Sequence, residues 1–193
     1  MPEHRELPLF RWGEDLRRGR DERRASRRSL VLVSICTVIV MALLATLLWP
    51  PRPLLVWNAS ASSPTGLYLV QAPGRVGVGD MVIAWLPDGA RRLGAERHYI
   101  PANVPLVKRV AAVAGDRACA VGEALFVNGR LEALRRSHDP AGRRMPWWTG
   151  CETLRDGELF LLTPGAGAAF DGRYFGITRP SHVVGAARLI WRG

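Results

Sequence analysis

The chain has 193 residues, a formal net charge of +10 and a hydrophobic content of 48%. Of its 27 basic residues, 26 are arginines and one, Lys108, is a lysine. The length fits one membrane segment followed by one folded domain of about 140 residues. The positive charge is scattered rather than clustered with aromatic side chains, which argues against a nucleic-acid-binding protein.

The N-terminal part of the sequence is typical of a membrane anchor. Residues 1–28 are polar, with nine arginines against six acidic residues, and Leu30 to Trp49 form an uncharged run of 20 residues. As a helix, such a run spans the ~30 Å hydrocarbon core of a bilayer. A cleaved signal peptide is the alternative, but no small-x-small cleavage site ends the run. We therefore predict a polar tail over residues 1–28 and a transmembrane anchor over residues 29–50.

The arginines that precede the anchor predict its orientation. Positive charges flank membrane segments on the cytoplasmic side, so the N-terminus should be cytoplasmic and residues 51–193 should form a domain outside the cytoplasm. In that domain, short apolar runs alternate with glycine, proline and aspartate, which is typical of β-strands. The predicted strands are Gly66–Val70, Asp80–Leu86, Pro105–Ala112, Ala124–Val127, Glu158–Leu162 and Val183–Trp191.

The sequence predicts an all-β fold for this domain, a barrel-like or folded-over sheet that follows a single N-terminal transmembrane helix. No segment after residue 50 has helical periodicity over three turns. The dipeptide Asn128-Gly129 predicts a hairpin turn. Cys119 and Cys151 both lie in the exported domain, where oxidation is permitted, and we predict that they form a disulfide. The four histidines are scattered without metal-ligand spacing, so we expect neither a metal site nor a cofactor.

A serine-rich stretch directly after the anchor is the first candidate for chemistry. Its serines are Ser60, Ser62 and Ser63, and they precede Pro64 and Gly66. Proline fixes φ and glycine permits unusual backbone angles, so a hydroxyl here can be held at a sharp turn lined by backbone N–H groups. A nucleophilic serine needs such a setting. A serine-rich linker beside the membrane is the alternative for this stretch alone.

Lys108, the single lysine, is the second candidate. On a strand, Leu106, Lys108 and Val110 share one face, which is otherwise apolar, while Arg109 points the other way. Burial lowers the pKa of a lysine, so that its neutral amine can act as a general base for a serine nucleophile. A lysine whose charged end reaches solvent at a strand end is the alternative.

Four sequence blocks resemble the type I signal peptidases, most closely the TraF-type peptidases of conjugative transfer. The stretch 58–68 resembles their pattern Asn-x-Ser-x-Ser-Met-Pro-x-Gly-x-Tyr, which implies that Ser62 is the nucleophile and Ser60 a contributor to the oxyanion hole. Ser63 stands where the family has methionine. The stretch 108–116 is similar to Lys-Arg-x-x-Gly-x-x-Gly-Asp, with Ala112 replacing the first glycine, and implies that Lys108 is the general base.

The third block, Phe126-Val127-Asn128-Gly129, is similar to the hairpin that follows in the family. The fourth block, 170–176 with the preceding Ala169, resembles the family pattern Ser-x-Asp-Ser-Arg-Tyr-Trp/Phe-Gly. The fourth block implies that Asp171 and Arg173 support the site through an ion pair; a surface salt bridge is the alternative. Ala169 and Gly172 replace two family serines, of which the first orients the lysine.

The resemblance implies a serine endopeptidase of the bacterial inner membrane, with its catalytic domain in the periplasm and no cofactor. Its partners would be exported precursor proteins, cleaved after a small residue, and in the transfer branch these are pilin subunits of a conjugative or type IV secretion system. The Gly66-Leu67-Tyr68 ending of the first block favours that branch over a general secretory signal peptidase I. A non-catalytic β-domain assembly factor of a secretion channel is the alternative from another class.

Overall fold

The computed structural model describes residues 8–48, 53–72, 74, 76–163, 165 and 169–193, with side chains from residue 27 onward. The chain divides into two compact units, Met1–Pro51 and Arg52–Gly193. The predicted junction between anchor and β domain, at residues 50 and 51, falls within residues 49–52, which lie outside the described residues.

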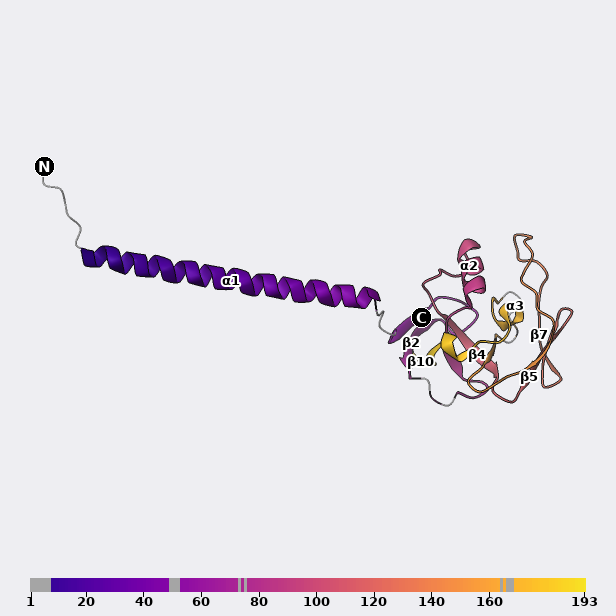
Figure 1. Cartoon of the computed structure of the whole chain (residues 1–193). Coiled ribbons are helices and arrows are strands. Elements are labelled where there is room, and N and C mark those ends of the chain that lie inside the picture. The colour runs from indigo at the N-terminus through magenta and orange to yellow at the C-terminus, as the bar shows by residue number, and fades with distance from the viewer. Residues whose placement is uncertain (1–7, 49–52, 73, 75, 164, 166–168) are drawn as a thin grey trace. The chain divides into compact units, whose positions relative to one another are not determined.

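The first unit contains one long helix, α1, which spans Pro8–Leu48 (Figure 1). Its segment Arg27–Leu48 is long and apolar enough to cross a membrane, and none of its most apolar stretch is buried in the protein. The helix also includes most of the segment predicted as a polar tail. Arginine, glutamate and leucine favour helices, and extending an existing helix adds one hydrogen bond per residue without a new nucleation cost.

The second unit is built from two antiparallel sheets, which confirms the all-β prediction. The larger sheet has the order β1-β2-β10-β3-β4-β9, and the smaller has the order β7-β6-β5-β8. The strands of the larger sheet are β1 (Leu55–Asn58), β2 (Gly66–Gln71), β3 (Met81–Ala84), β4 (Leu106–Ala112), β9 (Phe160–Leu162) and β10 (Val183–Arg192). Those of the smaller sheet are β5 (Arg117–Val121), β6 (Ala124–Val127), β7 (Arg130–Leu134) and β8 (Gly150–Thr153).

Three short helical segments complete this unit: α2 (Asp88–Glu96), α3 (Gly172–Phe175) and a 3₁₀ turn over Pro180–His182. In Figure 1, β2 and β10 lie at one end of the β domain and β5 and β7 at the other. The sequence did not predict α2, because nine residues make only two and a half turns, too few for a helical period to stand out.

The core joins the two sheets. Ala118 and Leu125 of the smaller sheet pack in one buried cluster with Ala112, Phe160 and Leu162 of the larger sheet. Two further clusters lie around β3 and β4, one including Val82 and Val110 and the other including Ile83 and Val107. Strand β4 has apolar neighbours on both faces, so both Val107 and Lys108 are buried. Arg109 is exposed, as the alternation along the strand predicts.

Each of the six predicted strand runs overlaps an observed strand, and the observed strands β2 and β10 each extend one residue further than predicted. Four observed strands lay outside the predicted set: β1, β5, β7 and β8. The predicted hairpin joins β6 and β7, and its turn residues Asn128 and Gly129 have φ values of 50° and 81°, as the tight hairpin turn favoured by Asn-Gly requires.

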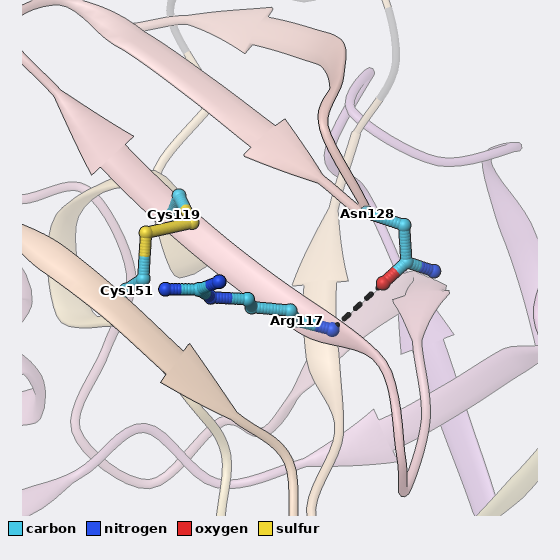
Figure 2. The surroundings of a disulfide bond; sticks show 4 residues. All are labelled: Arg117, Cys119, Asn128 and Cys151. Atoms are coloured by element: carbon cyan, nitrogen blue, oxygen red, sulfur yellow. Dashed lines mark hydrogen bonds between the residues drawn. A yellow bond between two sulfur atoms is a disulfide. The ribbon is translucent and has the colours of Figure 1, made fainter.

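The smaller sheet carries the predicted disulfide (Figure 2). Cys119 of β5 lies directly opposite Cys151 of β8, with their Cα atoms 4.0 Å apart, and their sulfur atoms are bonded. At the start of β5, the backbone N–H of Arg117 donates to the Asn128 Oδ1 atom at 2.8 Å, which fastens the strand to the β6–β7 turn. The bridge encloses the chain between residues 119 and 151, including the segment that follows β7.

Candidate active site

The serine-rich stretch forms a tight turn between β1 and β2, closed by a hydrogen bond from the Ser63 N–H to the Ser60 carbonyl. The buried side chain of Asn58, the last residue of β1, holds this turn from inside. Its Nδ2 atom lies 3.0–3.1 Å from the carbonyl oxygens of Ser60, Ser63 and Pro64, and its Oδ1 atom accepts from the Ser60 N–H. Sequence analysis assigned Asn58 no role, although asparagine is a common turn-forming residue.

The turn presents Ser62 to the single lysine of the chain. The Nζ atom of Lys108 lies 2.6 Å from the Oγ atom of Ser62, across 46 residues of sequence. The Oγ atoms of Ser60 and Ser62 are 2.8 Å apart, and the Ser62 N–H also reaches the Ser60 Oγ atom at 3.3 Å. The three side chains implied by the first two sequence blocks therefore meet at one point.

Ser63 is directed away from this point. Its side chain is buried, and its hydroxyl donates to the carbonyl oxygen of Val107 at 2.7 Å. The resemblance implies Ser62 as the nucleophile, although the adjacent Ser63 stands where the family has methionine. In the structure, Ser62 faces the amine, whereas the Ser63 hydroxyl connects the serine turn to β4. Substituting methionine, the family residue at this position, would remove that tie.

Burial sets the charge of Lys108. The residue is only 3% exposed, and desolvation lowers the pKa of its amine to about 8. The negative charge of Asp171 acts in the opposite direction and the positive charge of Arg173 adds to the lowering, both with smaller effect. With such a pKa, about half of the amines are neutral at pH 8, and a neutral amine can accept a proton from a serine hydroxyl.

A second hydroxyl contacts the lysine from the end of β9. The Lys108 Nζ atom lies 3.2 Å from the Oγ1 atom of Thr163, whose side chain is also buried. Sequence analysis did not single out Thr163, because one hydroxyl after the apolar run Phe160–Leu162 gives no signal of the strand pairing that brings it to β4. Its contact depends on the antiparallel register of β4 and β9.

Asp171 and Arg173 form a buried ion pair next to Thr163, not the surface salt bridge that was the alternative. They are 0% and 1% exposed, and the Arg173 Nε atom lies 2.8 Å from the Asp171 Oδ1 atom. Asp171 also caps α3 by accepting from the Arg173 N–H. The pair does not contact Lys108 through a hydrogen bond; it contacts the backbone of Thr163 on both sides, through the Thr163 N–H and carbonyl groups.

A groove of about 960 Å³ runs along Ser62 and Lys108. Most of its wall is apolar, with Ile100, Val104, Leu106, Met145, Ala169 and Phe170 among the lining residues. A second cavity of about 720 Å³ includes Ser62, Arg109 and Thr163 in its wall. Ser62 therefore borders both cavities.

The loop after β7 forms one side of the groove, and Asp139 fastens it. The buried Asp139 carboxylate accepts hydrogen bonds from the Tyr99 hydroxyl, from Arg143 Nε at 2.7 Å and from the Ala141 N–H at 2.9 Å. The hydrogen bond from Tyr99 is the largest of the contacts that hold the pKa of Asp139 well below its usual range. Within the described residues, no group of three or more His, Cys, Asp or Glu side chains could hold a metal ion.

The family model for signal peptidase, peptidase S26, matches residues 27–192. The chain belongs to the S26 signal peptidase family. Two plasmid transfer proteins TraF from Escherichia coli are 31% and 30% identical to it over 144 and 145 residues, which cover 71% and 70% of this chain and 77% and 75% of theirs. This similarity places the chain among the TraF-type members of the family.

A crystal structure of signal peptidase I from Enterococcus faecalis V583 aligns with 60% of this chain and 98% of its own length, at 14% identity and a TM-score of 0.35.

The chain departs from the family pattern at two positions of the fourth block, Ala169 and Gly172. At Gly172, a Cβ atom would lie 2.7 Å from the Leu161 carbonyl oxygen and 2.9 Å from the ring of Phe160, so the packing leaves no space for the family serine. Ala169 lines the groove without a hydroxyl group.

Proposed function

We propose that this signal peptidase is a membrane-anchored serine endopeptidase in which Ser62 is the nucleophile and Lys108 the general base. The observation that supports this most directly is the 2.6 Å contact between Lys108 Nζ and Ser62 Oγ, made by a buried amine with a pKa of about 8. Among the described residues, neither His138 nor His182 has a hydrogen bond to Ser62, so a histidine base finds no support in the geometry.

In the proposed mechanism, the neutral Lys108 amine takes the hydroxyl proton of Ser62 as the Oγ atom attacks the scissile carbonyl carbon. The Ser60 hydroxyl is close enough to Ser62 to donate to the oxyanion that forms. The ammonium of Lys108 then gives its proton to the leaving amine, the C–N bond breaks, and an acyl-enzyme ester on Ser62 remains. The same amine then takes a proton from a water molecule as the water oxygen attacks the ester carbon. The ester C–O bond breaks, the ammonium returns the proton to Ser62 Oγ, and the free serine and the neutral amine are restored.

The proposed substrates are exported precursor proteins, specifically pilin-like subunits of a conjugative or type IV secretion system. The support is the similarity to two proteins named for plasmid transfer, together with an apolar groove beside the nucleophile that suits small apolar side chains before the cleavage site. We propose that α1 anchors the protein in the bacterial inner membrane, with the N-terminus cytoplasmic and the β domain periplasmic. The arginines before the apolar segment support that orientation.

The test is processing of the pilin precursor of the same transfer system, co-expressed in membranes with the wild type or one of three variants. Ser62→Ala should abolish processing, Ser63→Ala should retain it, and Lys108→Arg should abolish it because a guanidinium stays charged and cannot accept the proton. If all three variants process the precursor, the protein is not a serine peptidase of this kind, and a non-catalytic assembly role fits better. Processing of general secretory precursors but not of pilin would instead indicate a housekeeping signal peptidase.

A further inference from the structure

The amine of Lys108 has a second hydrogen-bond partner whose function the proposed reaction leaves open. In the described part of the chain, its Nζ atom is hydrogen-bonded to Ser62 Oγ at 2.6 Å and to Thr163 Oγ1 at 3.2 Å. Both Lys108 and Thr163 are buried, at 3% and 8% exposure, so bulk water competes little for the second contact. This hydrogen bond is therefore a built part of the site rather than a surface contact.

A neutral amine has two N–H donors and one lone pair, arranged tetrahedrally. To remove a proton from Ser62, the lone pair must point at the Ser62 Oγ atom, and rotation about the Cε–Nζ bond would otherwise move it away. A donor bond from one N–H to Thr163 Oγ1 restricts this rotation. We propose that Thr163 is the positioning residue of Lys108, directing the lone pair of the amine at Ser62. This inference rests on the proposed function of the Ser62–Lys108 pair.

Thr163 can do this because its own backbone is fixed on both sides. Its N–H donates to the Asp171 Oδ2 atom at 2.9 Å, and its carbonyl oxygen accepts from the Arg173 Nη2 atom at 2.8 Å. The buried Asp171–Arg173 pair thus fixes Thr163, which in turn is hydrogen-bonded to Lys108. Besides the effect of its two charges on the Lys108 pKa, the ion pair therefore supports the reaction by fixing the backbone of Thr163.

The replacement of the family serine by Ala169 makes the threonine necessary here. In the pattern that the fourth block resembles, the serine at this position orients the lysine, and the methyl group of alanine cannot accept a hydrogen bond. Thr163 supplies a hydroxyl from the end of β9 instead of from the segment before α3. The lysine is thus held from the end of β9, and the Asp171–Arg173 pair holds the backbone of Thr163.

The experiment uses a property specific to this sequence: Lys108 is its single lysine. Lysine labelled with ¹³C and ¹⁵N, incorporated into the full chain in detergent micelles, gives side-chain signals from one residue only, so the pH titration of its Cε and Nζ signals reports Lys108 alone. The variants are Thr163→Val, which keeps the shape but removes the hydroxyl, and Thr163→Ser, which keeps the hydroxyl. Cleavage is followed on an internally quenched peptide with alanine at the first and third positions before the scissile bond.

We expect Thr163→Val to lower the Lys108 pKa below that of the wild type, because the ammonium loses an acceptor. Its kcat should fall about 10- to 100-fold with KM nearly unchanged, a loss typical of a general base held in the wrong orientation. The acid limb of its pH–rate profile should move to lower pH. Thr163→Ser should stay within about 2-fold of the wild type in kcat and keep the wild-type titration, since the same oxygen is present.

The outcomes separate the two proposals. Failure of the wild type to cleave either the peptide or the precursor contradicts the proposed function, while titration of Ser62→Ala with and without Thr163→Val still measures the hold of Thr163 on Lys108. Cleavage by the wild type together with an unchanged titration and kcat in Thr163→Val contradicts the role of Thr163 alone. Equal loss of activity in Thr163→Ser and Thr163→Val, with an unchanged lysine titration, would assign Thr163 a purely structural part.

Discussion

The side-chain amide of Asn58 donates to the carbonyl oxygen of Ser63 at 3.1 Å. This contact helps to hold the turn that presents Ser62, the candidate nucleophile. Asn58 is the last residue of β1, directly before the turn. The hydroxyl of Ser63 donates to the carbonyl oxygen of Val107 in β4, the residue that precedes Lys108. The two candidate reactive groups are thus held relative to each other by a buried amide and a buried hydroxyl, neither of which takes part in the proposed reaction.

Asn58→Ala should therefore reduce catalysis, although the Asn58 side chain takes no part in the proposed reaction. Without the amide, three carbonyl oxygens of the turn lose a donor, and we expect kcat to fall at least ~10-fold and the free energy of unfolding to fall by about 2 kcal/mol. The measurements are peptide cleavage and urea unfolding of the purified chain. A variant that cleaves at the wild-type rate would show that the serine turn holds its shape without Asn58.

The matched control is Asn128→Gly in the β6–β7 turn. Glycine keeps the positive φ of this position while removing the hydrogen bonds that Asn128 makes to Asp116 and to the Arg117 N–H. Stability should fall, as in Asn58→Ala, but kcat should not change. Equal losses of activity in both variants would mean that general destabilisation, not the serine turn, is being measured.

Lys108→Met should make the protein inactive but more stable at pH 7. Below pH 8 the folded wild type carries a buried ammonium, and lowering its pKa from 10.5 to about 8 corresponds to a cost of about 3 kcal/mol. Methionine removes this cost, although Thr163 then loses a hydrogen-bond partner, which offsets about 1 kcal/mol. We expect the denaturant midpoint of Lys108→Met to exceed that of the wild type at pH 7.

The stability difference between Lys108→Met and the wild type should depend on pH. Between pH 8 and about 10.5 the unfolded wild-type chain still binds the lysine proton and the folded chain does not, so wild-type stability rises with pH relative to the variant. The advantage of Lys108→Met should therefore shrink from pH 8 upward and be gone near pH 10.5. A stability difference that stays constant over this range would contradict burial as the cause of the lowered pKa.

Removing the disulfide should affect substrate binding more than the chemical step. The bridge between Cys119 and Cys151 closes a loop with a sequence separation of 32, and losing it should cost about 4 kcal/mol of stability. Because the loop includes groove-lining residues such as Met145, we expect the Cys119→Ser/Cys151→Ser variant to raise KM several-fold with a smaller change in kcat. Cys36→Ser, in the exposed face of α1, is the control and should change neither value.

Unfolding midpoints and steady-state kinetics of the three proteins, with and without a reductant, measure these effects. A double serine variant with wild-type KM would show that the Asp139 contacts fix the loop without the disulfide. Reductant should act on the wild type as the double substitution does, since Cys36 has no partner within the described residues.

Restoring the family serine at position 172 should damage this chain. A Cβ atom at Gly172 would lie 2.7 Å from a backbone oxygen, which cannot move aside as a flexible side chain could. We expect Gly172→Ser to lower the unfolding midpoint and to reduce kcat, because α3 and its capping residue Asp171 would shift. Gly89→Ser in α2, where no atom lies within 4 Å of the added Cβ, is the control and should be nearly neutral. Wild-type stability in Gly172→Ser would mean that the β9–α3 contact adapts.

The sequence predicted the parts of this protein that depend on local pattern. Apolar runs between turn residues placed six strands, and the Asn-Gly dipeptide placed the β6–β7 hairpin, because strand periodicity and turn chemistry act over a few residues. The prediction that Ser62 pairs with Lys108 rested on the resemblance of two sequence blocks to a family pattern. Local sequence patterns could not have given it, because the two residues lie 46 positions apart.

The parts that the sequence did not predict depend on distant contacts. Thr163 reaches Lys108 only because β9 pairs with β4 in one register, and an isolated threonine does not reveal that register. The buried Arg173 side chain likewise depends on distant partners, because it donates to the carbonyl oxygens of Leu134 in β7 and of Thr163 after β9. Strands β5 and β8 were not predicted because β5 consists of only five residues, two of them alanines, and β8 begins with a glycine and is exposed at all four of its residues.

The most direct test of the central claim is to identify the residue that becomes acylated. Wild-type protein mixed with the alanine-containing peptide is quenched in acid within the first turnover and digested, and the digest is analysed by mass spectrometry. We predict a peptide acyl ester on Ser62, present also in Ser63→Ala and absent in Lys108→Met. Acylation of Ser63, or undiminished acylation of Ser62 in Lys108→Met, would contradict the account.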